Sequence, residues 1–220
     1  MNQKGFTLIE ILVALVLVGL LVGVAISNPF SQRKSLEEDL DQIERGLRYM
    51  NDEAALKNTV VRLHVFLDKD PGEWAIEYGP TENFILPAKK EVGAGTETEA
   101  EEEARKKEEK ETNLNFNKIS DFQEDNLTLK TNVKFMGIAS RLTETLQNKG
   151  EAAIYAFPGG EKDEALVILA TEEEIATLEV EAFSSKIKRT FYSLEERKEE
   201  DLENKQSAAA QEAYQQWLKK

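Results

Sequence analysis

One acidic side chain of this chain lies where an ionised carboxylate is costly. Glu10 falls inside the apolar run 6–26, which is close to the roughly 20 residues that a helix needs to cross the hydrocarbon core of a bilayer. A charged group in such a segment costs about 2.5–3.5 kcal/mol on insertion scales and therefore marks a functional site. The chemistry that suits Glu10 is charge pairing, because a carboxylate in a low-dielectric layer needs a cationic partner.

The other reactive side chains do not favour catalysis. The chain has no cysteine and a single histidine, His64, which argues against disulfides, thiolate chemistry, a histidine metal cage and a Ser–His triad. We interpret His64, two positions before Phe66, as a surface or packing residue, and a hairpin turn explains the crowding of Asp68, Asp70 and Glu73. No Gly-rich phosphate loop, nucleophile elbow or metal-ligand spacing is present. We expect no enzyme activity, no cofactor and no metal site.

The charge of the chain bears on its partners. Its 220 residues include 28 Lys+Arg and 42 Asp+Glu, which gives a formal net charge of −14. Because phosphate contacts require a basic face, we expect no nucleic acid among its partners. Lys186, Lys188 and Arg189 lie together on a predicted last strand, and they leave a DNA-uptake role as an alternative.

The flanks of the apolar run predict its orientation in a membrane. Residues 1–5 precede it and contain Lys4, a positive flank of the kind that stays in the cytoplasm. A secretory signal peptide would have a shorter apolar core and an Ala-x-Ala-like cut site, and Ala25-Ile26-Ser27 fits that site poorly. We therefore expect a transmembrane helix over 6–28 with the amino terminus inside and the bulk of the chain outside. A plain signal anchor would leave Glu10 unexplained.

The junction itself carries a resemblance. The sequence Lys4-Gly5-Phe6-Thr7-Leu8-Ile9-Glu10 resembles the leader junction of type IV pilins and type II secretion pseudopilins. The resemblance implies that 1–5 is a leader peptide, that prepilin peptidase cuts after Gly5, and that the new amino terminus at Phe6 is methylated. It also implies that Glu10 pairs with the terminal amine of a neighbouring subunit during assembly. The residues alone leave intrachain pairing open as well, because Phe6 and Glu10 are one helical turn apart.

The chain after the apolar run predicts an amphipathic helix over 29–58. Pro29 stops or kinks a helix locally, because it lacks an amide hydrogen. Beyond it, apolar residues recur at intervals of three and four positions, which is typical of one buried helix face. They are Leu36, Leu40, Ile43, Leu47, Met50 and Ala54. A coiled-coil partner is the alternative, but the strand signals that follow favour a sheet of the same chain as the covering surface.

The segment 59–193 predicts a β-rich periplasmic domain. Alternating residues indicate a hairpin with one buried face over 61–68 and 73–78, and a short strand is expected at 83–86. Further strands are predicted at 127–130, 133–138, 153–157, 165–170, 175–182 and 187–192. The acidic stretch 88–113 has almost no large apolar side chain and is read as a solvated insertion. The final stretch 194–220 is expected to be a helical or disordered tail.

The order of these segments carries a second resemblance. The strand at Val61-Arg62-Leu63, the Trp-containing strand 73–78 and Phe157-Pro158-Gly159-Gly160 resemble minor pseudopilin H and the related minor type IV pilins. The implied fold is α+β and pilin-like, with a long amino-terminal helix packed on antiparallel sheets.

The implied protein is a minor pseudopilin of a type II protein secretion system. It would span the bacterial inner membrane once. The implied partners are prepilin peptidase, other pseudopilins, the inner-membrane assembly platform, membrane lipid and exported protein substrates. A minor pilin of a type IV pilus and a membrane-anchored binding module that does not polymerise are the alternatives.

Overall fold

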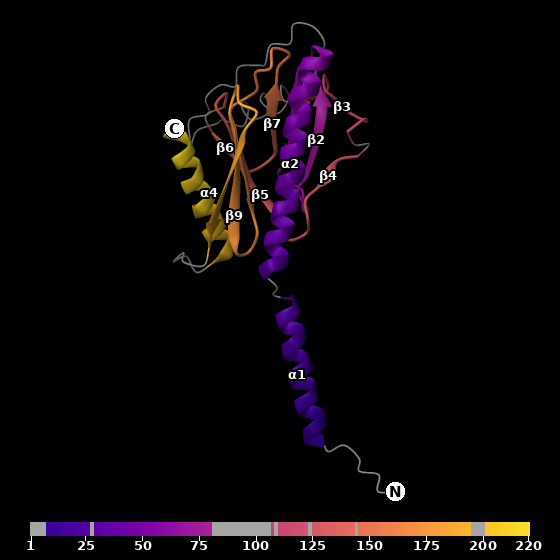
Figure 1. The fold of residues 1–220 in the computed structure, drawn as a ribbon, viewed down its shortest axis with the longest axis vertical. Coiled ribbons are helices and arrows are strands. Elements are labelled where there is room, and N and C mark those ends of the chain that lie inside the picture. Colours follow the sequence, from indigo (N-terminus) through magenta and orange to yellow (C-terminus); the bar gives the residue numbers. More distant parts are fainter. Residues whose placement is uncertain are drawn as a thin grey trace.

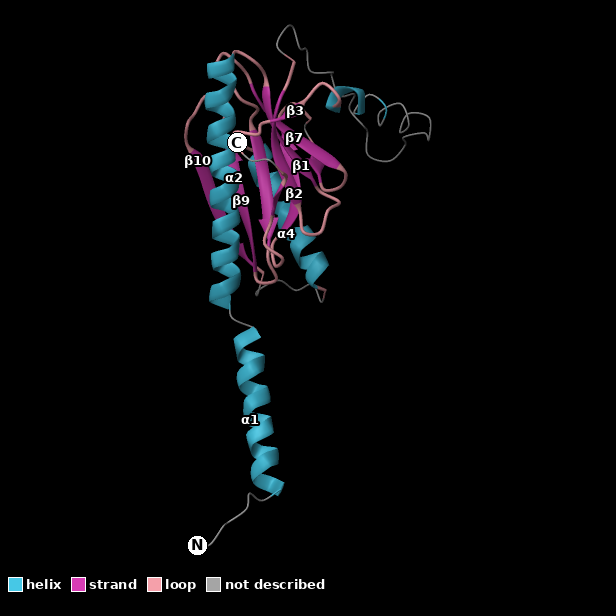
Figure 2. Ribbon diagram, turned by 90° about the vertical axis from the view of Figure 1, so that its right-hand side faces the viewer, coloured by secondary structure: helices cyan, strands magenta, loops and turns pink. Residues whose placement is uncertain are grey.

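The computed structural model describes residues 8–26, 29–80, 107, 110–122, 125–143, 145–194 and 201–220. These residues form an α+β structure of two antiparallel sheets and three helices, α1 (Leu8–Ile26), α2 (Pro29–Lys57) and α4 (Leu202–Leu218). Figure 1 shows α1 beyond the amino-terminal end of α2, away from the sheets, and Figure 2 shows α2 lying lengthwise along the sheets. The predicted strand at 83–86 and most of the acidic stretch 88–113 lie outside the described residues.

The first sheet is built on the predicted hairpin. Its strands run in the order β3-β2-β1-β7, and β4 pairs with β2. Their bounds are β1 (Val61–Phe66), β2 (Glu73–Tyr78), β3 (Asn117–Lys118), β4 (Leu127–Thr128) and β7 (Glu151–Ala156). In the antiparallel register, Arg62 of β1 lies opposite Glu77 of β2 on one side and opposite Tyr155 of β7 on the other.

The second sheet has the strand order β10-β9-β8-β5-β6. Its strands are β5 (Lys134–Ser140), β6 (Leu146–Gln147), β8 (Ala165–Ala170), β9 (Glu174–Val180) and β10 (Ile187–Ser193). The central strand β8 is buried at every position. Alternate residues of β8, such as Val167 and Leu169, enter the main core, whereas Leu166 and Ile168 enter a second core beneath α4. The second sheet is therefore covered on both faces.

The apolar stripe of α2 fills the main core. All six predicted stripe residues are at most 1 % exposed, and they pack with residues of both sheets. Gly46 permits this close approach, because a Cβ at this position would lie 2.8 Å from the Trp74 ring. The covering surface of α2 is thus a pair of sheets from its own chain, as the strand signals predicted.

The carboxyl-terminal residues form α4, which packs on the second sheet. Small side chains and one tryptophan of the helix are buried there: Ala209, Ala210, Ala213 and Trp217. Gln206 is also buried and donates through Nε2 to the carbonyl oxygen of Thr171 at 2.6 Å. Of the two states expected for the tail, the structure has the helix, docked onto the outer face of the second sheet.

One expectation for the hairpin was wrong. The alternation in 61–68 predicted one buried face and one solvent-facing side. In the structure Arg62 and His64 are only 2 % and 4 % exposed, although they point away from the main core. The reason is that Asn113, the last residue of the acidic stretch, and Phe116, which follows it, reach across this outer face. A period-two pattern reports polarity, and polar residues can be buried when they are paired.

Candidate functional site

The amino-terminal helix carries the acid singled out from the sequence. Glu10 is exposed in the first turn of α1, and the same helix exposes large apolar side chains. These include Leu8, Ile9, Ile11, Leu12, Val13, Leu15, Val16, Leu17 and Val18, which are 50–83 % exposed. Lys4, Gly5 and Phe6 lie outside the described residues. An apolar helix that is exposed in this way needs a lipid or protein partner to cover it.

Within the part of the chain that the structure describes, no helix meets the combined length and apolarity requirements for a membrane span.

A buried ionic cluster lies on the outer face of the first sheet. Arg62 donates to Glu77 Oε2 from Nε at 2.7 Å and to Asn113 Oδ1 from Nη1 at 2.7 Å. His64 lies between two carboxylates, with Nδ1 3.2 Å from Glu77 Oε2 and Nε2 3.1 Å from Glu151 Oε2. Burial alone would raise the pKa of Glu77, but the hydrogen bond from His64 and the charge of Arg62 outweigh it and lower the pKa.

This cluster holds the chain where it returns from the acidic stretch. The Arg62 guanidinium lies 3.9 Å from the centre of the Phe116 ring, a cation–π contact of the kind that is stronger when desolvated. Asn113 also donates to Glu151 Oε2 from Nδ2 at 2.7 Å. Glu77 and Glu151, the two carboxylates of the cluster, both have partners. The cluster is therefore better suited to holding the chain in place than to transferring a proton. Of the two interpretations offered for His64, a surface or a packing residue, the structure has the buried one.

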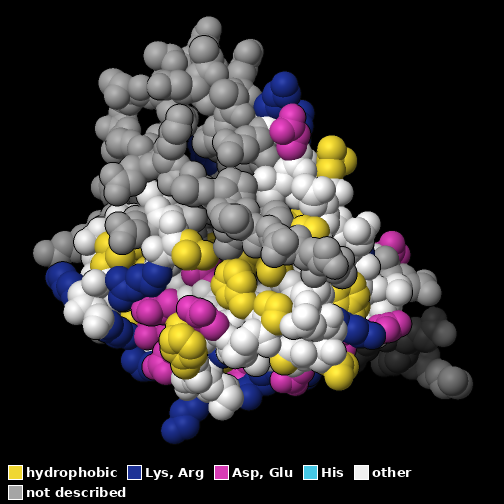
Figure 3. Space-filling view, turned by 90° about the horizontal axis from the view of Figure 1, so that it is seen from above, with side chains coloured by type: hydrophobic (Ala, Val, Ile, Leu, Met, Phe, Trp, Pro, Cys, Tyr) yellow, Lys and Arg dark blue, Asp and Glu magenta, His cyan; other side chains and the backbone are white. Residues whose placement is uncertain are grey.

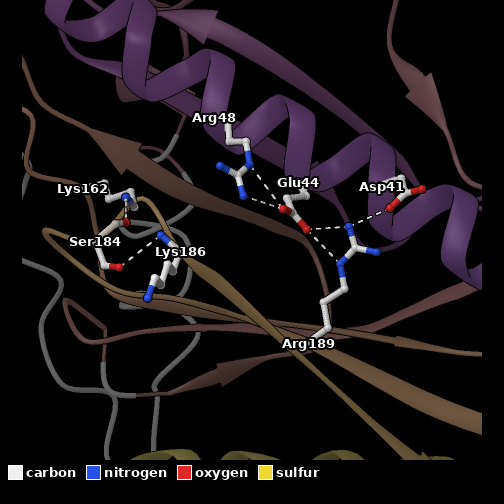
Figure 4. Close-up of polar contacts among 7 residues, drawn as sticks. All are labelled: Asp41, Glu44, Arg48, Lys162, Ser184, Lys186 and Arg189. Carbon is white, nitrogen blue, oxygen red and sulfur yellow. Dashed lines mark hydrogen bonds and ion pairs between the residues drawn. The ribbon is translucent and has the colours of Figure 1, made fainter.

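A second charged cluster joins α2 to β10 (Figure 4). Glu44 accepts from Arg48 Nη2 at 2.8 Å and from Arg189 Nη2 at 2.5 Å. The same Arg189 nitrogen lies 2.7 Å from Asp41 Oδ1. Although burial acts in the opposite direction, the two arginines lower the pKa of Glu44. Of the three basic residues that left a DNA-uptake role open, Arg189 is thus directed toward acids of α2, and Lys188 lies 3.7 Å from Glu179 Oε1.

The surface at the end of the body opposite α1 carries both positive and negative side chains. Figure 3 shows Lys and Arg side chains interspersed with Asp, Glu and apolar side chains on this face. Among the described residues, no group of three or more histidine and acidic side chains is arranged to hold a metal ion.

Comparison with known proteins gives one match, over the segment that the sequence analysis singled out. Residues 1–26 match the family model described as the prokaryotic N-terminal methylation motif. The chain therefore carries the signal of a type IV pilin-like or pseudopilin precursor. The match implies processing by prepilin peptidase and assembly with other pilins. No curated protein and no solved structure matches the chain.

Three features of the body were missed by the sequence reasoning. They are the Arg62 cluster, the buried carboxylate of Asp39 and the buried ammonium of Lys162. The first had a signal, because a hairpin of 61–66 with 73–78 places Arg62 opposite Glu77. Asp39 lies between apolar stripe positions of α2, but nothing in its spacing distinguishes it from solvent-facing acids. Lys162 had no local signal, since its burial depends on a loop more than 20 residues away.

Proposed function

We propose that this protein is a minor pseudopilin, a structural subunit of the periplasmic pseudopilus of a type II secretion system. The observation that carries the proposal is the N-terminal methylation motif over residues 1–26. The exposed apolar surface of α1 supports it, because a helix of this kind can lie in a membrane before assembly and against other helices afterwards. The resemblance of the body to minor pseudopilin H supports the choice of system and of the minor class.

In the proposed mechanism the amino-terminal segment changes its partner. Before processing, helix 6–28 anchors the chain in the inner membrane with the body in the periplasm. Cleavage after Gly5 frees a cationic amine at Phe6. During assembly Glu10 neutralises the amine of a neighbouring subunit, since each charge is costly alone in an apolar layer. The sheets then form part of the filament surface, where a low-copy subunit can meet exported proteins or other pseudopilins.

Substitution of the junction tests the proposal directly. In a strain with prepilin peptidase, Gly5→Ala is expected to leave most of the protein molecules uncleaved, because the peptidase is expected to act at the glycine. Intact-mass measurement of the purified protein checks this by showing whether residues 1–5 remain attached. Gly19→Ala is the matched control, since a Cβ there meets no atom within 4 Å. Normal yield of a Gly5→Ala chain that begins at Phe6 would contradict the leader assignment.

Substitution of the acid tests the assembly step. Glu10→Val is expected to preserve membrane insertion, because it removes a charge from an apolar segment, but to reduce incorporation into filaments. Site-specific crosslinking between the first helix and other pseudopilins, compared with the membrane-bound amount, measures the two steps separately. Incorporation of the variant at the wild-type level would remove the role given to Glu10. Absence of any crosslink in the wild type would favour the anchored binding module.

A deletion strain separates the two filament systems. Loss of exported proteins from the medium with normal surface pili is the outcome expected for a pseudopilin. Loss of pili or of DNA uptake with normal secretion would instead identify a minor pilin. The genes that flank the coding sequence give an independent answer, because secretion and pilus clusters encode different outer components.

A further inference from the structure

A cavity of about 150 Å³ lies between α2 and the chain that connects β9 to β10. The α2 side contributes Leu47, Arg48, Asn51 and Asp52, and the opposite side contributes Lys162, Ser185 and Ile187. The volume exceeds what a single water needs, so the cavity has room for a small polar ligand. Neither the ionic cluster of the first sheet nor the methylation motif contributes to it.

The first unusual feature of the cavity is a buried lysine. Lys162 is 6 % exposed, and its Nζ donates to the carbonyl oxygen of Ser184 at 2.5 Å. Among the described residues no carboxylate lies within ion-pair distance of this ammonium. Lysine is almost never this buried unless it is paired. A neutral carbonyl satisfies one of its three donors and supplies no full opposite charge in contact with the ammonium.

The second feature is a like charge across the cavity. Burial lowers the pKa of Lys162, the charge of Arg48 lowers it further, and Glu181 partly compensates. Figure 4 shows Arg48 on α2, directed toward Glu44, and Lys162 on a separate segment, directed toward Ser184. Glu44 accepts from Nε and Nη2 of Arg48, which leaves other donors of the guanidinium for a ligand. Two cations thus border one cavity; Glu44 pairs with Arg48, whereas among the described residues the ammonium of Lys162 contacts only a neutral carbonyl.

The backbone holds Lys162 firmly in this place. Phe157 and Glu161 close the preceding turn through a 2.8 Å hydrogen bond, and Gly160 adopts a φ of 83° there. The Lys162 amide donates to the carbonyl oxygen of Ala182 at 3.0 Å. The turn at Phe157–Gly160, which is part of the resemblance to minor pseudopilin H, therefore fixes Lys162 against the β9–β10 connection. A site that is preorganised in this way loses little entropy when it binds a ligand.

We propose that this cavity binds a small oxyanion, a carboxylate or phosphate group, between Arg48 and Lys162. Such a ligand would relieve the repulsion of the two cations and give the Lys162 ammonium a charged acceptor. The planar guanidinium fork suits two oxygens of one group, whereas the ammonium acts as a point charge. Asn51 also lines the cavity and has a buried Oδ1 without a partner among the described residues. Rotation of its amide presents two N–H donors to the same ligand. The site is independent of the proposed role in filament assembly.

Thermal unfolding of the full chain in neutral detergent tests the proposal. Sodium phosphate, and separately sodium acetate, replaces sodium chloride at constant ionic strength while the Tm is recorded. For the wild type we expect a saturable rise in Tm with at least one of the two anions. Lys162→Met and Arg48→Gln are expected to weaken the apparent affinity about tenfold or more, because each removes a charged hydrogen-bond donor.

Matched variants keep this test specific. Lys186→Met and Arg45→Gln remove cations from the neighbouring loop and from the same helix, but neither residue lines the cavity, so wild-type affinity is expected for both. If Lys162→Met does not fold, Arg48→Gln carries the test, because about half of that side chain is exposed. Absence of a saturable Tm shift, or the same shift in Arg48→Gln as in the wild type, would overturn the proposal.

Sedimentation velocity distinguishes the two sources of the ligand. If the oxyanion is a carboxylate of a second copy, the wild type self-associates, phosphate dissociates it, and Arg48→Gln remains monomeric. If the oxyanion is a free ion, the sedimentation of the wild type does not depend on phosphate although its Tm does. Both outcomes support an oxyanion site and differ only in its occupant.

Discussion

The two helices at the amino-terminal end of the chain differ in where their apolar side chains find a partner. In α1 the apolar residues surround the helix and are exposed. In α2 they form one stripe, which both sheets bury almost completely. A helix that is apolar all round requires an apolar environment from outside, whereas an amphipathic helix can obtain one from its own chain. The second helix therefore serves folding, and the proposed function assigns assembly to the first.

The acids of the two helices follow the same division. Glu10 of α1 is exposed, and the proposed function gives it a partner on another subunit. Asp39 of α2 is 1 % exposed and accepts from the Lys130 amide at 2.9 Å through Oδ2. Its other oxygen, Oδ1, has no hydrogen-bond partner among the described residues. The acid of the folding helix is thus held by its own chain, although incompletely.

The largest expected difference in stability comes from truncating one leucine in each helix. Leu40→Ala removes a fully buried residue of the α2 stripe, so we expect it to lower the free energy of unfolding by about 3 kcal/mol. Leu15→Ala removes a side chain that is 67 % exposed on α1, and we expect no change in unfolding of the body. Chemical denaturation followed by the fluorescence of Trp74 and Trp217 measures both. A similar loss in the two variants would show that α1 is part of the folded core.

The next effect is a dependence of stability on pH that Asp39 of α2 produces. Burial raises the pKa of Asp39 to about 6, against the hydrogen bond and charge of Lys130. The folded state therefore binds the Asp39 proton more tightly than the unfolded state, whose pKa lies near 3.9. The stability contributed by this proton is present below about pH 4 and is lost as the pH rises through about 6. We expect a loss on the order of 2 kcal/mol across this window.

Denaturation at several pH values checks the Asp39 effect against two variants. Asp39→Asn is expected to abolish this part of the pH dependence, because the amide does not titrate. Glu10→Gln is expected to keep it. A wild-type stability that stays constant between pH 4 and 7 while Asp39→Asn also shows no change would mean that the buried carboxylate has an ordinary pKa.

A smaller effect is expected from adding one methyl group to a glycine of each helix. Gly46→Ala places a Cβ 2.8 Å from the Trp74 ring, so the gain in helix propensity is outweighed by overpacking, and we expect a net loss of about 1–2 kcal/mol. Gly19→Ala meets no atom within 4 Å and is expected to leave the unfolding of the body unchanged. Thermal unfolding of the pair measures the difference. Equal Tm values would show that Trp74 moves aside without cost.

The sequence predicted the parts of the fold that depend on local periodicity. The predicted stripe of α2 and the predicted strand 165–170 are present in the structure. Both could be predicted because the pattern of apolar residues is visible within a short stretch of sequence. The two-residue strands β3 and β6 were missed, since two residues have no period. The burial of Arg62 and His64 was also missed, because Asn113 and Phe116, which are about 50 positions away, cover them.

The candidate sites divide in the same way. Gly5, Phe6 and Glu10 could be proposed from the sequence because the junction is a contiguous pattern of neighbouring residues. The placement of Arg48 and Lys162 on one cavity was not predicted, because the two residues are 114 positions apart and border the same cavity only when α2 packs against the β9–β10 connection. Contiguous recognition sites can be read from a sequence, whereas sites that folding assembles require the coordinates.

The Arg62 cluster has a practical consequence for engineering. The chain is fixed on the near side of the acidic stretch, where the Gly79 amide donates to the Val60 carbonyl at 2.7 Å, and on the far side, where the Ile119 amide donates to the Ile76 carbonyl at 3.0 Å. Because lengthening the connection between two fixed points costs little entropy, epitope tags or fluorophore-bearing peptides can be inserted between Gly79 and Ile119 with both attachment points secured. The same position would carry a label on the body at a distance in sequence from the leader junction and from α1.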